Sequence, residues 1–390
     1  MDYTSSDLTF KIRKAIRYAR MYGPRRTLTK IRGQYHMKKH YRVLPPVRLP
    51  VEGGHVGIIG CGNFSYCNVA HYLLKNYGRV MRGCMDIDVE RAASLYEKYG
   101  LRYYTDDHDR IINDPSIDLY YIASNHATHA EYAVAALEAG KCVHIEKPHV
   151  VTVEQLRRLC RTIQNTGRKV NLGFLRPRSP MGQMIRRYLD AESGPAMFNW
   201  FIGGHEIPPD NWYFKEEEGG RVLGNLCHWT DFVYQMVPPE KRFPITIIPT
   251  RWEKSDCDIA VTYVFADGTI SAITFSAKGH IFEGVSERFT AQKGNTLICL
   301  DDFRRLTIDV LERKRVVSPR FRDHGHEGNI KRSYQMVRPM EGGFDGWSLE
   351  NIWETGELFL KTKDALERND KIIVTAYDPS KLNEASLAAS

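Results

Sequence analysis

The sequence predicts an α/β protein with a doubly wound parallel sheet, followed by a second, α+β domain with a large, open and mostly antiparallel sheet. Two patterns predict this architecture. Between residues 55 and 175, short apolar segments alternate with amphipathic helical segments, as parallel strands joined by helices do. After residue 180, strand-like segments follow one another directly, with hairpin turns between them.

The size and composition are those of a protein with two globular domains. The chain has 390 residues, of which 42% are hydrophobic and 26% are charged. Its apolar runs are too short to span a membrane and its N-terminus lacks the features of a signal peptide, so we expect a cytoplasmic protein. None of the eight cysteines forms a C-x-x-C pair, which favours reduced thiols over disulfides or a zinc site.

The basic charge is concentrated in residues 1–50. This segment holds 13 Lys and Arg against two Asp, a net charge of +11, which leaves −3 of the total of +8 for the rest of the chain. A nucleic-acid-binding core is therefore not expected. Leu8, Ile12, Ile16 and Ala19 recur at helical spacing between the basic residues. We expect an amphipathic arm that packs on the body or on a partner subunit; the alternative is attachment to an anionic membrane surface.

The parallel sheet is predicted from six apolar segments. In chain order these are HVGIIG, RVMRGCMDID, LRYYTD, IDLYYIAS, KCVHIEKP and KVNLGFL. Amphipathic segments between them predict the helices. Two of these helices begin with residues that can form a capping box, Thr128 with Glu131 and Thr152 with Gln155.

A phosphate-binding loop is predicted directly after the first strand. In Gly60-Cys61-Gly62-Asn63-Phe64-Ser65, two glycines permit a tight turn and the close approach of a pyrophosphate, which the following helix faces with its N-terminus. Asp86 ends the next strand, where a carboxylate can accept hydrogen bonds from an adenosine ribose and repel a 2′-phosphate. Together these residues predict a Rossmann domain that binds NAD in preference to NADP.

The changes of pattern along the chain predict three segments. We expect a basic arm and linker at residues 1–50, the NAD-binding Rossmann domain at 51–175, and a substrate and oligomerisation domain at 176–390. The sequences ADGT and KGNT mark hairpin turns in the third segment. A late helix, SLENIWETGELFLKTKDALERN, is expected to pack back against the body.

Two further strand ends carry polar side chains, and ligands bind at the carboxyl ends of strands in such sheets. Pro148 biases the backbone so that Lys147 faces the cleft, where its ammonium can hydrogen-bond a substrate hydroxyl beside the nicotinamide. A surface ion pair between Lys147 and Glu146 is equally compatible with the local sequence. The predicted cofactor contacts are Gly60, Gly62, Asn63, Phe64, Asp86, Ser124, Asn125, His126, Glu146 and Lys147.

Three histidines are candidates for a site. His126 and His129 have the spacing of two metal ligands, but no carboxylate or thiol accompanies them at ligand spacing, so we expect no metal there. His228 and Asp231, in GGRVLGNLCHWTDF, are three residues apart and share a face if the segment is helical. His228 then suits acid–base chemistry with Asp231 orienting its ring, and the alternative is a half-buried structural histidine.

In combination, these residues resemble the glucose-fructose oxidoreductase / inositol dehydrogenase / MocA (Gfo/Idh/MocA) family. The resemblance runs from about residue 55 to 375 and is most specific at AGKCVHIEKP. It implies a nicotinamide cofactor, an open sheet in the second domain, oligomers, and oxidation or reduction of a sugar or cyclitol hydroxyl. By motif, Lys147 matches the family's catalytic lysine, His228 its catalytic histidine, and Gly60, Gly62 and Asp86 its cofactor positions.

A narrower resemblance is carried by IASNHATHA, PPDNW and GGRVLGNLCHWTDF. These segments look like oxidoreductases linked to surface-polysaccharide and sugar-nucleotide pathways. The chain departs from that subgroup at three positions: Asn125 replaces an expected Arg, Asn225 an expected Glu, and Gly224 an acid. The substrate or the direction of the reaction is therefore expected to differ from the subgroup.

We therefore expect an NAD-dependent oxidoreductase that transfers a hydride between nicotinamide and a ring carbon of a sugar, in particular a nucleotide-linked one. Lys147 polarises the reacting oxygen, His228 relays the proton and Asp231 orients His228. One alternative uses tightly bound NAD as a recycled redox agent for elimination, epimerisation or glycoside cleavage; another is a non-catalytic cofactor-binding scaffold or sensor. The predicted substrate contacts are Trp212, Tyr213, His205 and Arg176.

Overall fold

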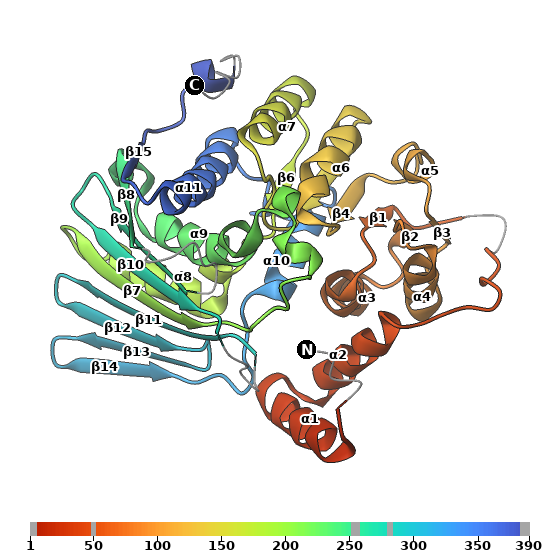
Figure 1. Ribbon diagram of the computed structural model, residues 1–390, viewed down its shortest axis with the longest axis horizontal. Coiled ribbons are helices and arrows are strands. Elements are labelled where there is room, and N and C mark those ends of the chain that lie inside the picture. Colours follow the sequence, from red (N-terminus) through yellow and green to blue (C-terminus); the bar gives the residue numbers. More distant parts are fainter. Residues whose placement is uncertain (1–5, 48–51, 251–257, 279–283, 383–390) are drawn as a thin grey trace.

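The computed structural model describes residues 6–47, 52–250, 258–278 and 284–382. Two sheets lie next to each other, a parallel sheet built from the first half of the chain and a larger sheet built from the second half (Figure 1). The predicted fold class is confirmed. Seven of the eight cysteines lie in the described ranges and are unpaired there, and Cys257 lies outside them.

The parallel sheet has six strands in the order β3-β2-β1-β4-β5-β6. The order reverses between β1 and β4, which is the switch point at which doubly wound sheets bind their ligands. Every pair of neighbouring strands is parallel. The strands are β1 (Val56–Ile59), β2 (Met81–Met85), β3 (Tyr103–Thr105), β4 (Leu119–Ile122), β5 (Cys142–Ile145) and β6 (Val170–Leu172).

Helices connect these strands, as the sequence pattern predicts. Thr152 caps its helix by accepting a hydrogen bond from the Gln155 backbone N–H at 3.1 Å. The other predicted capping box is not formed: the helix begins at His126, so Thr128 and Glu131 already lie inside it. The connecting helices are α3 (Ala70–Tyr77), which continues the π-helical turn Ser65–Val69, α4 (Val89–Tyr99), α5 (His108–Ile112), α6 (His126–Glu138) and α7 (Val153–Thr166).

The second sheet has nine strands in the order β14-β13-β12-β11-β7-β10-β9-β8-β15. Only β7 and β10 pair in parallel; the other described pairs are antiparallel. The predicted hairpin turns join β9 to β10 and β11 to β12. The strands are β7 (Ala196–Gly203), β8 (Ile245–Thr250), β9 (Asp258–Val264), β10 (Ile270–Ser276), β11 (Ser286–Lys293), β12 (Thr296–Asp301), β13 (Arg305–Val310), β14 (Arg313–Val317) and β15 (Ile372–Val374).

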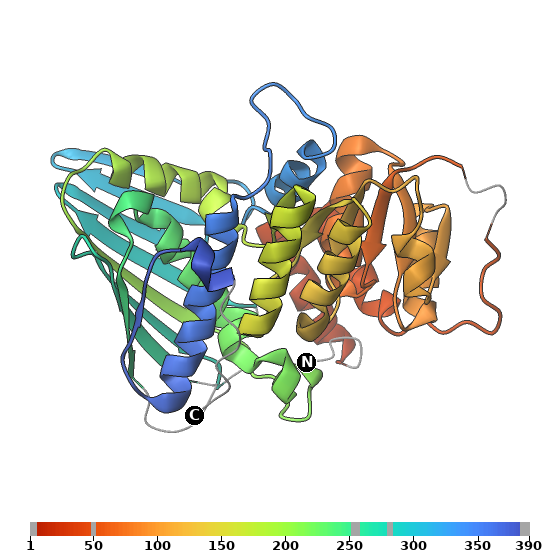
Figure 2. The same ribbon diagram turned by 90° about the horizontal axis from the view of Figure 1, so that it is seen from above.

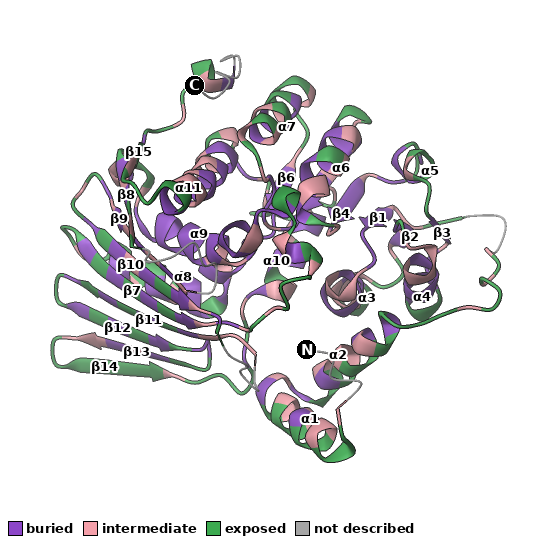
Figure 3. Ribbon diagram, in the orientation of Figure 1, coloured by how far each residue is buried: buried purple, intermediate pink, exposed green. Residues whose placement is uncertain are grey.

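One face of this sheet is covered by helices and the other is open. Residues of β7 alternate strictly between buried and exposed positions, as expected for a strand with one face on a core. Figure 3 shows the exposed positions along the outer strands of this sheet, most completely on β14. The covering helices are α8 (Pro180–Asp190), α9 (Cys227–Met236) and α11 (Leu349–Arg368).

Two late helices tie the domains together. The predicted late helix, α11, packs against both α7 and the large sheet, between the two domains (Figure 2). The helix α10 (His326–Gln335) packs on the parallel sheet, where Tyr121 donates a hydrogen bond to the Ile330 carbonyl at 2.8 Å. Residues far along the chain therefore complete the first domain.

The basic arm forms a helical hairpin of α1 (Leu8–Tyr22) and α2 (Pro24–His36), joined at Gly23. It packs on the body, as expected, but not through the expected face. Leu8 and Ile12 are 71% and 50% exposed, whereas Lys14 is only 8% exposed. The face of α1 that contacts the protein is mixed, since Lys14 and Met21 are both buried, whereas Leu8, Ile12 and Ile16 are open to solvent. No helix in the described ranges combines the length and the hydropathy needed to cross a bilayer.

Candidate active site

The phosphate loop has the geometry that a dinucleotide requires. Gly60 adopts a φ of 85°, and a Cβ at this position would lie 2.5 Å from the backbone of Ala123, so only glycine fits. A Cβ at Gly62 would meet nothing within 4 Å, so there is open space above this residue. Ser65 replaces the third glycine and donates a hydrogen bond to the Gly60 carbonyl, which closes the loop. A phosphate can thus approach the backbone at Gly62.

Asp86 holds this loop from the end of β2. Its Oδ2 accepts a hydrogen bond from the Cys61 N–H at 2.6 Å, and its Oδ1 accepts one from the Asp88 N–H at 2.9 Å. Burial raises the pKa of the Asp86 carboxyl above its usual value. Arg91 lies 3.0 Å from the Asp88 carboxylate. Arg91 is therefore paired with Asp88 and is not available to a 2′-phosphate. The loop and Asp86 together fit NAD.

Lys147 stands at the carboxyl end of β5, where the Lys147–Pro148 peptide bond is cis. Its Nζ donates a hydrogen bond to the Gly224 carbonyl, in the π-helical turn Val222–Leu226 of the second domain, at 2.6 Å. The predicted surface ion pair with Glu146 is not formed among the described contacts. The side chain therefore reaches the second domain.

Glu146 is buried next to Lys147 and forms hydrogen bonds within the first domain. Its side chain is buried, its Oε1 lies 3.1 Å from His144 Nε2, and its Oε2 accepts a hydrogen bond from the Lys147 N–H at 3.3 Å. A Cβ at Gly173 would lie 2.6 Å from Glu146 Oε2, so β6 packs directly against the carboxylate. The expected cofactor contact of Glu146 is corrected to a structural role.

The ring of His126, at the start of α6, meets the rings of Trp212 and Tyr213 from the 3-10 turn Trp212–Phe214. The His126 ring lies edge-on to both aromatic rings, with centroid distances of 5.0 Å each, and its Nδ1 is 3.0 Å from the Glu218 carbonyl oxygen. Burial, then the charge of Lys147, lowers the pKa of His126 to about 2, so its imidazole is neutral. Trp212 is partly exposed, which leaves its ring accessible to a ligand.

Gly224 explains one departure from the subgroup pattern. A Cβ at this position would lie 2.0 Å from the Tyr213 hydroxyl and 2.7 Å from the His126 ring. An acidic side chain therefore cannot occupy position 224 without displacing these rings. Ser124 and Asn125 remain accessible at the end of β4, and the Asn125 side chain makes no capping hydrogen bond to α6.

His228 lies on α9, and its pKa is lowered well below the usual value. Burial is the largest cause of that lowering and Arg176 the next, so the His228 ring is neutral. The predicted contact between Asp231 and His228 is absent: Asp231 Oδ1 accepts a hydrogen bond from Gln235 at 3.3 Å, and Oδ2 has no partner among the described residues. Burial raises the pKa of Asp231 to about 7.

The structure separates the other two predicted substrate contacts. His205 is half-buried in the loop after β7, and a Cβ at Gly284 would lie 3.7 Å from its Nε2. Arg176 is not available to a substrate, because its Nε donates a hydrogen bond to Glu287 at 2.8 Å and its guanidinium lies over the Trp229 ring. The expected substrate contact of Arg176 is therefore corrected to a buried ion pair.

Sequence reasoning missed two groups beside the loop. His326, at the start of α10, has its ring 6.1 Å from that of Phe64, and His324 lies next to it. In the N-terminal hairpin, His36 Nε2 is 2.6 Å from the Cys61 carbonyl oxygen. The segment DHGHEG, with two histidines around a glycine, was a visible signal for the first group. Nothing local indicated that α2 would reach the loop.

The comparisons with known proteins agree with this site. Residues 55–174 match the Gfo/Idh/MocA family model, described as an oxidoreductase family with an NAD-binding Rossmann fold. The scyllo-inositol 2-dehydrogenase (NAD(+)) of Bacillus subtilis is 25% identical over 238 residues, which are 57% of this chain and 68% of that protein. The D-xylose dehydrogenase of Paenarthrobacter nicotinovorans is 27% identical over 184 residues, 43% of this chain and 47% of that protein.

Solved structures share the whole architecture. A levoglucosan dehydrogenase in complex with NADH and levoglucosan superposes with a TM-score of 0.71 at 18% identity, over 83% of this chain and 100% of that chain. GenD2 from gentamicin A biosynthesis, in complex with NAD, gives a TM-score of 0.69 at 17% identity, over 86% and 100%. These likenesses concern the fold. The curated relatives and the family match identify the protein as an NAD-binding oxidoreductase that acts on CH–OH groups, and its residues 55–174 match the Rossmann domain of the Gfo/Idh/MocA family model.

Proposed function

We propose that the protein transfers a hydride between the nicotinamide of NAD and a ring carbon of a sugar carried on a nucleotide. The observation that supports this most directly is the position of Lys147, whose ammonium bridges from the end of β5 to the Gly224 carbonyl of the second domain. NAD, when bound, supplies the hydride chemistry. Gly60, Gly62 and Asp86 would hold it, with Ser124, Asn125 and His126 near the nicotinamide half.

In the proposed mechanism, Lys147 donates a hydrogen bond to the reacting oxygen and stabilises its alkoxide-like state during oxidation. His228 is neutral, so it can accept the hydroxyl proton, directly or through water. Trp212, whose ring meets that of His126, flanks the substrate. Asp231 is given no step, because it bonds to Gln235 and not to His228.

The test is direct. The purified protein is titrated with NAD, and turnover is followed at the NADH absorbance band with a panel of free sugars, cyclitols and nucleotide-linked sugars. Turnover of a nucleotide-linked sugar with NADH formation supports the proposal. Substrate conversion without lasting NADH absorbance indicates a recycled cofactor instead, and binding of NAD without turnover of any substrate indicates a scaffold.

Asp86→Ser is expected to weaken NAD binding by about tenfold or more, because a carboxylate hydrogen bond to the ribose hydroxyls is worth about 1.5–3 kcal/mol. The variant also removes the repulsion of a 2′-phosphate, so the preference for NAD over NADP should narrow. Both dissociation constants are measured by fluorescence titration. Asp106→Ser, at an exposed position after β3, is the control. An unchanged NAD affinity in Asp86→Ser would contradict the ribose role.

We also propose that the outer face of the N-terminal hairpin attaches to an anionic lipid surface. Leu8, Ile12 and Ile16 on α1 are exposed, as are Leu28 and Ile31 on α2. Exposed arginines surround these side chains, and Asp7 is the one acidic residue among residues 6–47. A basic helical pair with an apolar outer face suits the headgroup region of an anionic membrane.

Vesicle sedimentation tests this attachment. Binding to phosphatidylglycerol vesicles should exceed binding to phosphatidylcholine vesicles, and the double substitution Ile12→Ser/Ile16→Ser should weaken it by about tenfold or more, since each isoleucine loses part of about 1.5–3 kcal/mol of burial energy. Leu311→Ser, at an exposed apolar residue on the β13–β14 turn, is the control. Equal binding to both vesicle types would refute the proposal.

A further inference from the structure

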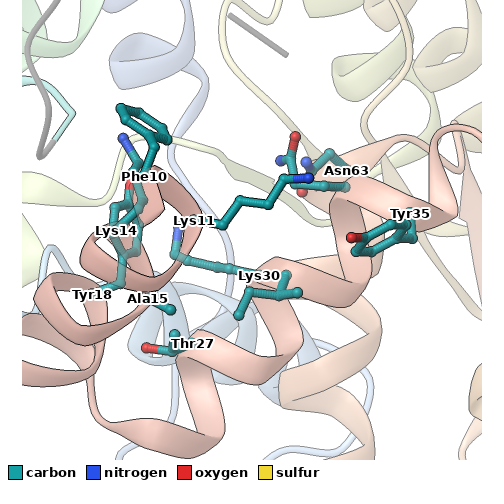
Figure 4. Close-up of a pocket in the computed structure, with 11 residues that line it drawn as sticks. Phe10, Lys11, Lys14, Ala15, Tyr18, Thr27, Lys30, Tyr35 and Asn63 are labelled. Atoms are coloured by element: carbon teal, nitrogen blue, oxygen red, sulfur yellow. The ribbon is translucent and has the colours of Figure 1, made fainter. Parts of the chain in front are cut away.

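The N-terminal hairpin forms a cavity beside the phosphate loop, lined by three lysines together with apolar and aromatic side chains. The cavity has a volume of about 250 Å³ and lies between α1 and α2, with Asn63 of the loop among its lining residues. Lys11 and Lys14 from α1 and Lys30 from α2 also line it, and Figure 4 shows these side chains together with Asn63 around one space. No acidic residue is among the described residues that line the cavity.

Lys30 has Arg26 and Arg322 among its charged neighbours. Its ammonium lies over the rings of Tyr18 and Tyr22, at 5.8 Å and 5.2 Å. Burial, followed by the charge of Arg26, lowers the pKa of Lys30 to about 8. An anion in the cavity would relieve this repulsion between cations.

The hairpin is held tightly against the loop that faces this cavity. A Cβ at Gly33 of α2 would lie 2.4 Å from Cys67 Sγ and 3.0 Å from Asn63 Oδ1, so α2 packs as closely as glycine permits. His36 contacts the Cys61 carbonyl, as described above. At the other end of the hairpin, the Met21 carbonyl accepts a hydrogen bond from the Arg322 N–H at 2.8 Å. The hairpin thus spans from the Rossmann domain to the second domain.

The loop side of the cavity is also suited to a phosphate. Asn63 begins the helix that continues into α3, so the first N–H groups of this helix lack intrahelical partners and carry partial positive charge. The space above the neighbouring Gly62 is open. Lysine ammonium groups and the N–H groups at the start of a helix are both donors that bind phosphates, and Asn63 brings the start of this helix to the cavity.

We propose that this cavity binds the diphosphate of a nucleotide ligand beside Asn63 of the phosphate loop, with Lys11, Lys14 and Lys30 as its cationic partners. The inference rests on the proposed function for the identity of the ligand, because both NAD and a nucleotide-linked sugar carry a diphosphate ester. The hairpin is then a part of the ligand site, and the arm contributes binding residues from its polar face.

The experiment compares two double variants of the full chain. Lys11→Gln/Lys30→Gln removes two cavity cations, and Arg13→Gln/Arg20→Gln removes two exposed charges from the same hairpin. NAD and uridine diphosphate are the probes, and dissociation constants are measured by calorimetry. Circular dichroism of both variants checks that they are folded, and the single substitution Lys11→Gln provides a milder change should the cavity variant unfold.

A loss of tenfold or more for either probe in the cavity variant, with less than a twofold change in the control, supports the proposal. Loss for NAD assigns the cavity to the cofactor diphosphate, and loss for uridine diphosphate assigns it to the substrate. Equal losses in both double variants, or no loss in either, would overturn it. If wild-type protein bound uridine diphosphate through these lysines but never bound NAD, the proposed function would fail while the cavity assignment stood.

Discussion

Lys147→Met is expected to lower kcat by about 10²–10⁴-fold, the range that a positioned acid–base group contributes. Methionine keeps the length of the side chain but has no proton to share with the reacting oxygen. The Nζ of Lys147 is bonded to the Gly224 carbonyl at 2.6 Å, so the ammonium is already placed between the domains. NAD binding should change by less than about tenfold, since Gly60, Gly62 and Asp86 are untouched.

The measurement separates chemistry from binding. Single-turnover formation of NADH gives the rate of the chemical step, and fluorescence titration gives the NAD affinity. Lys98→Met, at an exposed lysine on α4, is the matched control and should retain full activity. A Lys147→Met enzyme with a normal single-turnover rate would show that the lysine has no catalytic role, whatever its effect on stability.

Glu287→Ala is expected to destabilise the protein by about 3–5 kcal/mol, as the removal of one partner from a buried ion pair does. Glu287 is fully buried on β11 and accepts hydrogen bonds from Arg176 Nε at 2.8 Å and Trp229 Nε1 at 2.7 Å. The ring of His324 lies 3.0 Å from its other oxygen, and Arg322 lies 3.8 Å from it. Alanine would leave two arginines buried without this carboxylate.

Urea unfolding followed by tryptophan fluorescence measures the change. Glu312→Ala is the control, because Glu312 is exposed on the β13–β14 turn and should alter the free energy of unfolding by less than about 0.5 kcal/mol. Glu287→Gln keeps the shape and should fall between the two. If Glu287→Ala unfolded with the wild-type midpoint and slope, the network would not contribute to stability.

The same network sets an expected pH dependence. The charge of Arg176 is the main cause that holds the pKa of Glu287 below its usual value despite its burial. This stabilisation is complete above about pH 4.3, the unfolded value, and is lost as the pH falls through the lower, folded value. The pKa of His324 is lowered to about 4, so stability also falls below about pH 6.5, where the unfolded histidine takes up a proton.

Asp302, a neighbour of this network, changes the stability with pH in the opposite direction. Burial raises the pKa of Asp302 to about 6, so its destabilising effect is present above that value and is relieved as the pH falls toward about 4. Between pH 6 and pH 4 the effects of Asp302 and His324 therefore oppose each other. The steepest loss of stability is expected below about pH 4, and it should be smaller in Glu287→Gln when urea midpoints at pH 3 and pH 7 are compared.

Local sequence was sufficient for much of the fold. The parallel strands and their helices follow from apolar periodicity, and the loop geometry follows from Gly60, whose positive φ is confirmed. Lys147 was predictable as a cleft residue because strand ends meet at one edge of such a sheet and Pro148 restricts the backbone before it. The hairpins of the second sheet follow from their glycine turns.

The tertiary structure decided which polar residues are free to meet a ligand. Arg176, Glu146 and Asp231 looked like site residues because charge at a strand end or a helix face suggests function. The partner of Arg176 is Glu287, which is distant in the sequence. Glu146 and Asp231 have partners within four residues of them in the chain. Buried polar groups need such partners, because leaving them unpaired costs free energy. The spacing of residues in the sequence does not predict which carboxylate will form an ion pair with a buried cation.

The sequence by itself determined the doubly wound domain, the NAD loop with Asp86, and Lys147 at the strand end, because each depends on residues close together in the chain. Only the tertiary structure decided that the arm buries Lys14 and leaves Leu8, Ile12 and Ile16 open to solvent, contrary to the usual orientation of an amphipathic helix. Helix periodicity defines two faces, but which one is buried depends on what the helix packs against. Here Lys11, Lys14 and Lys30 line a cavity between the two helices of the arm and Asn63 of the loop.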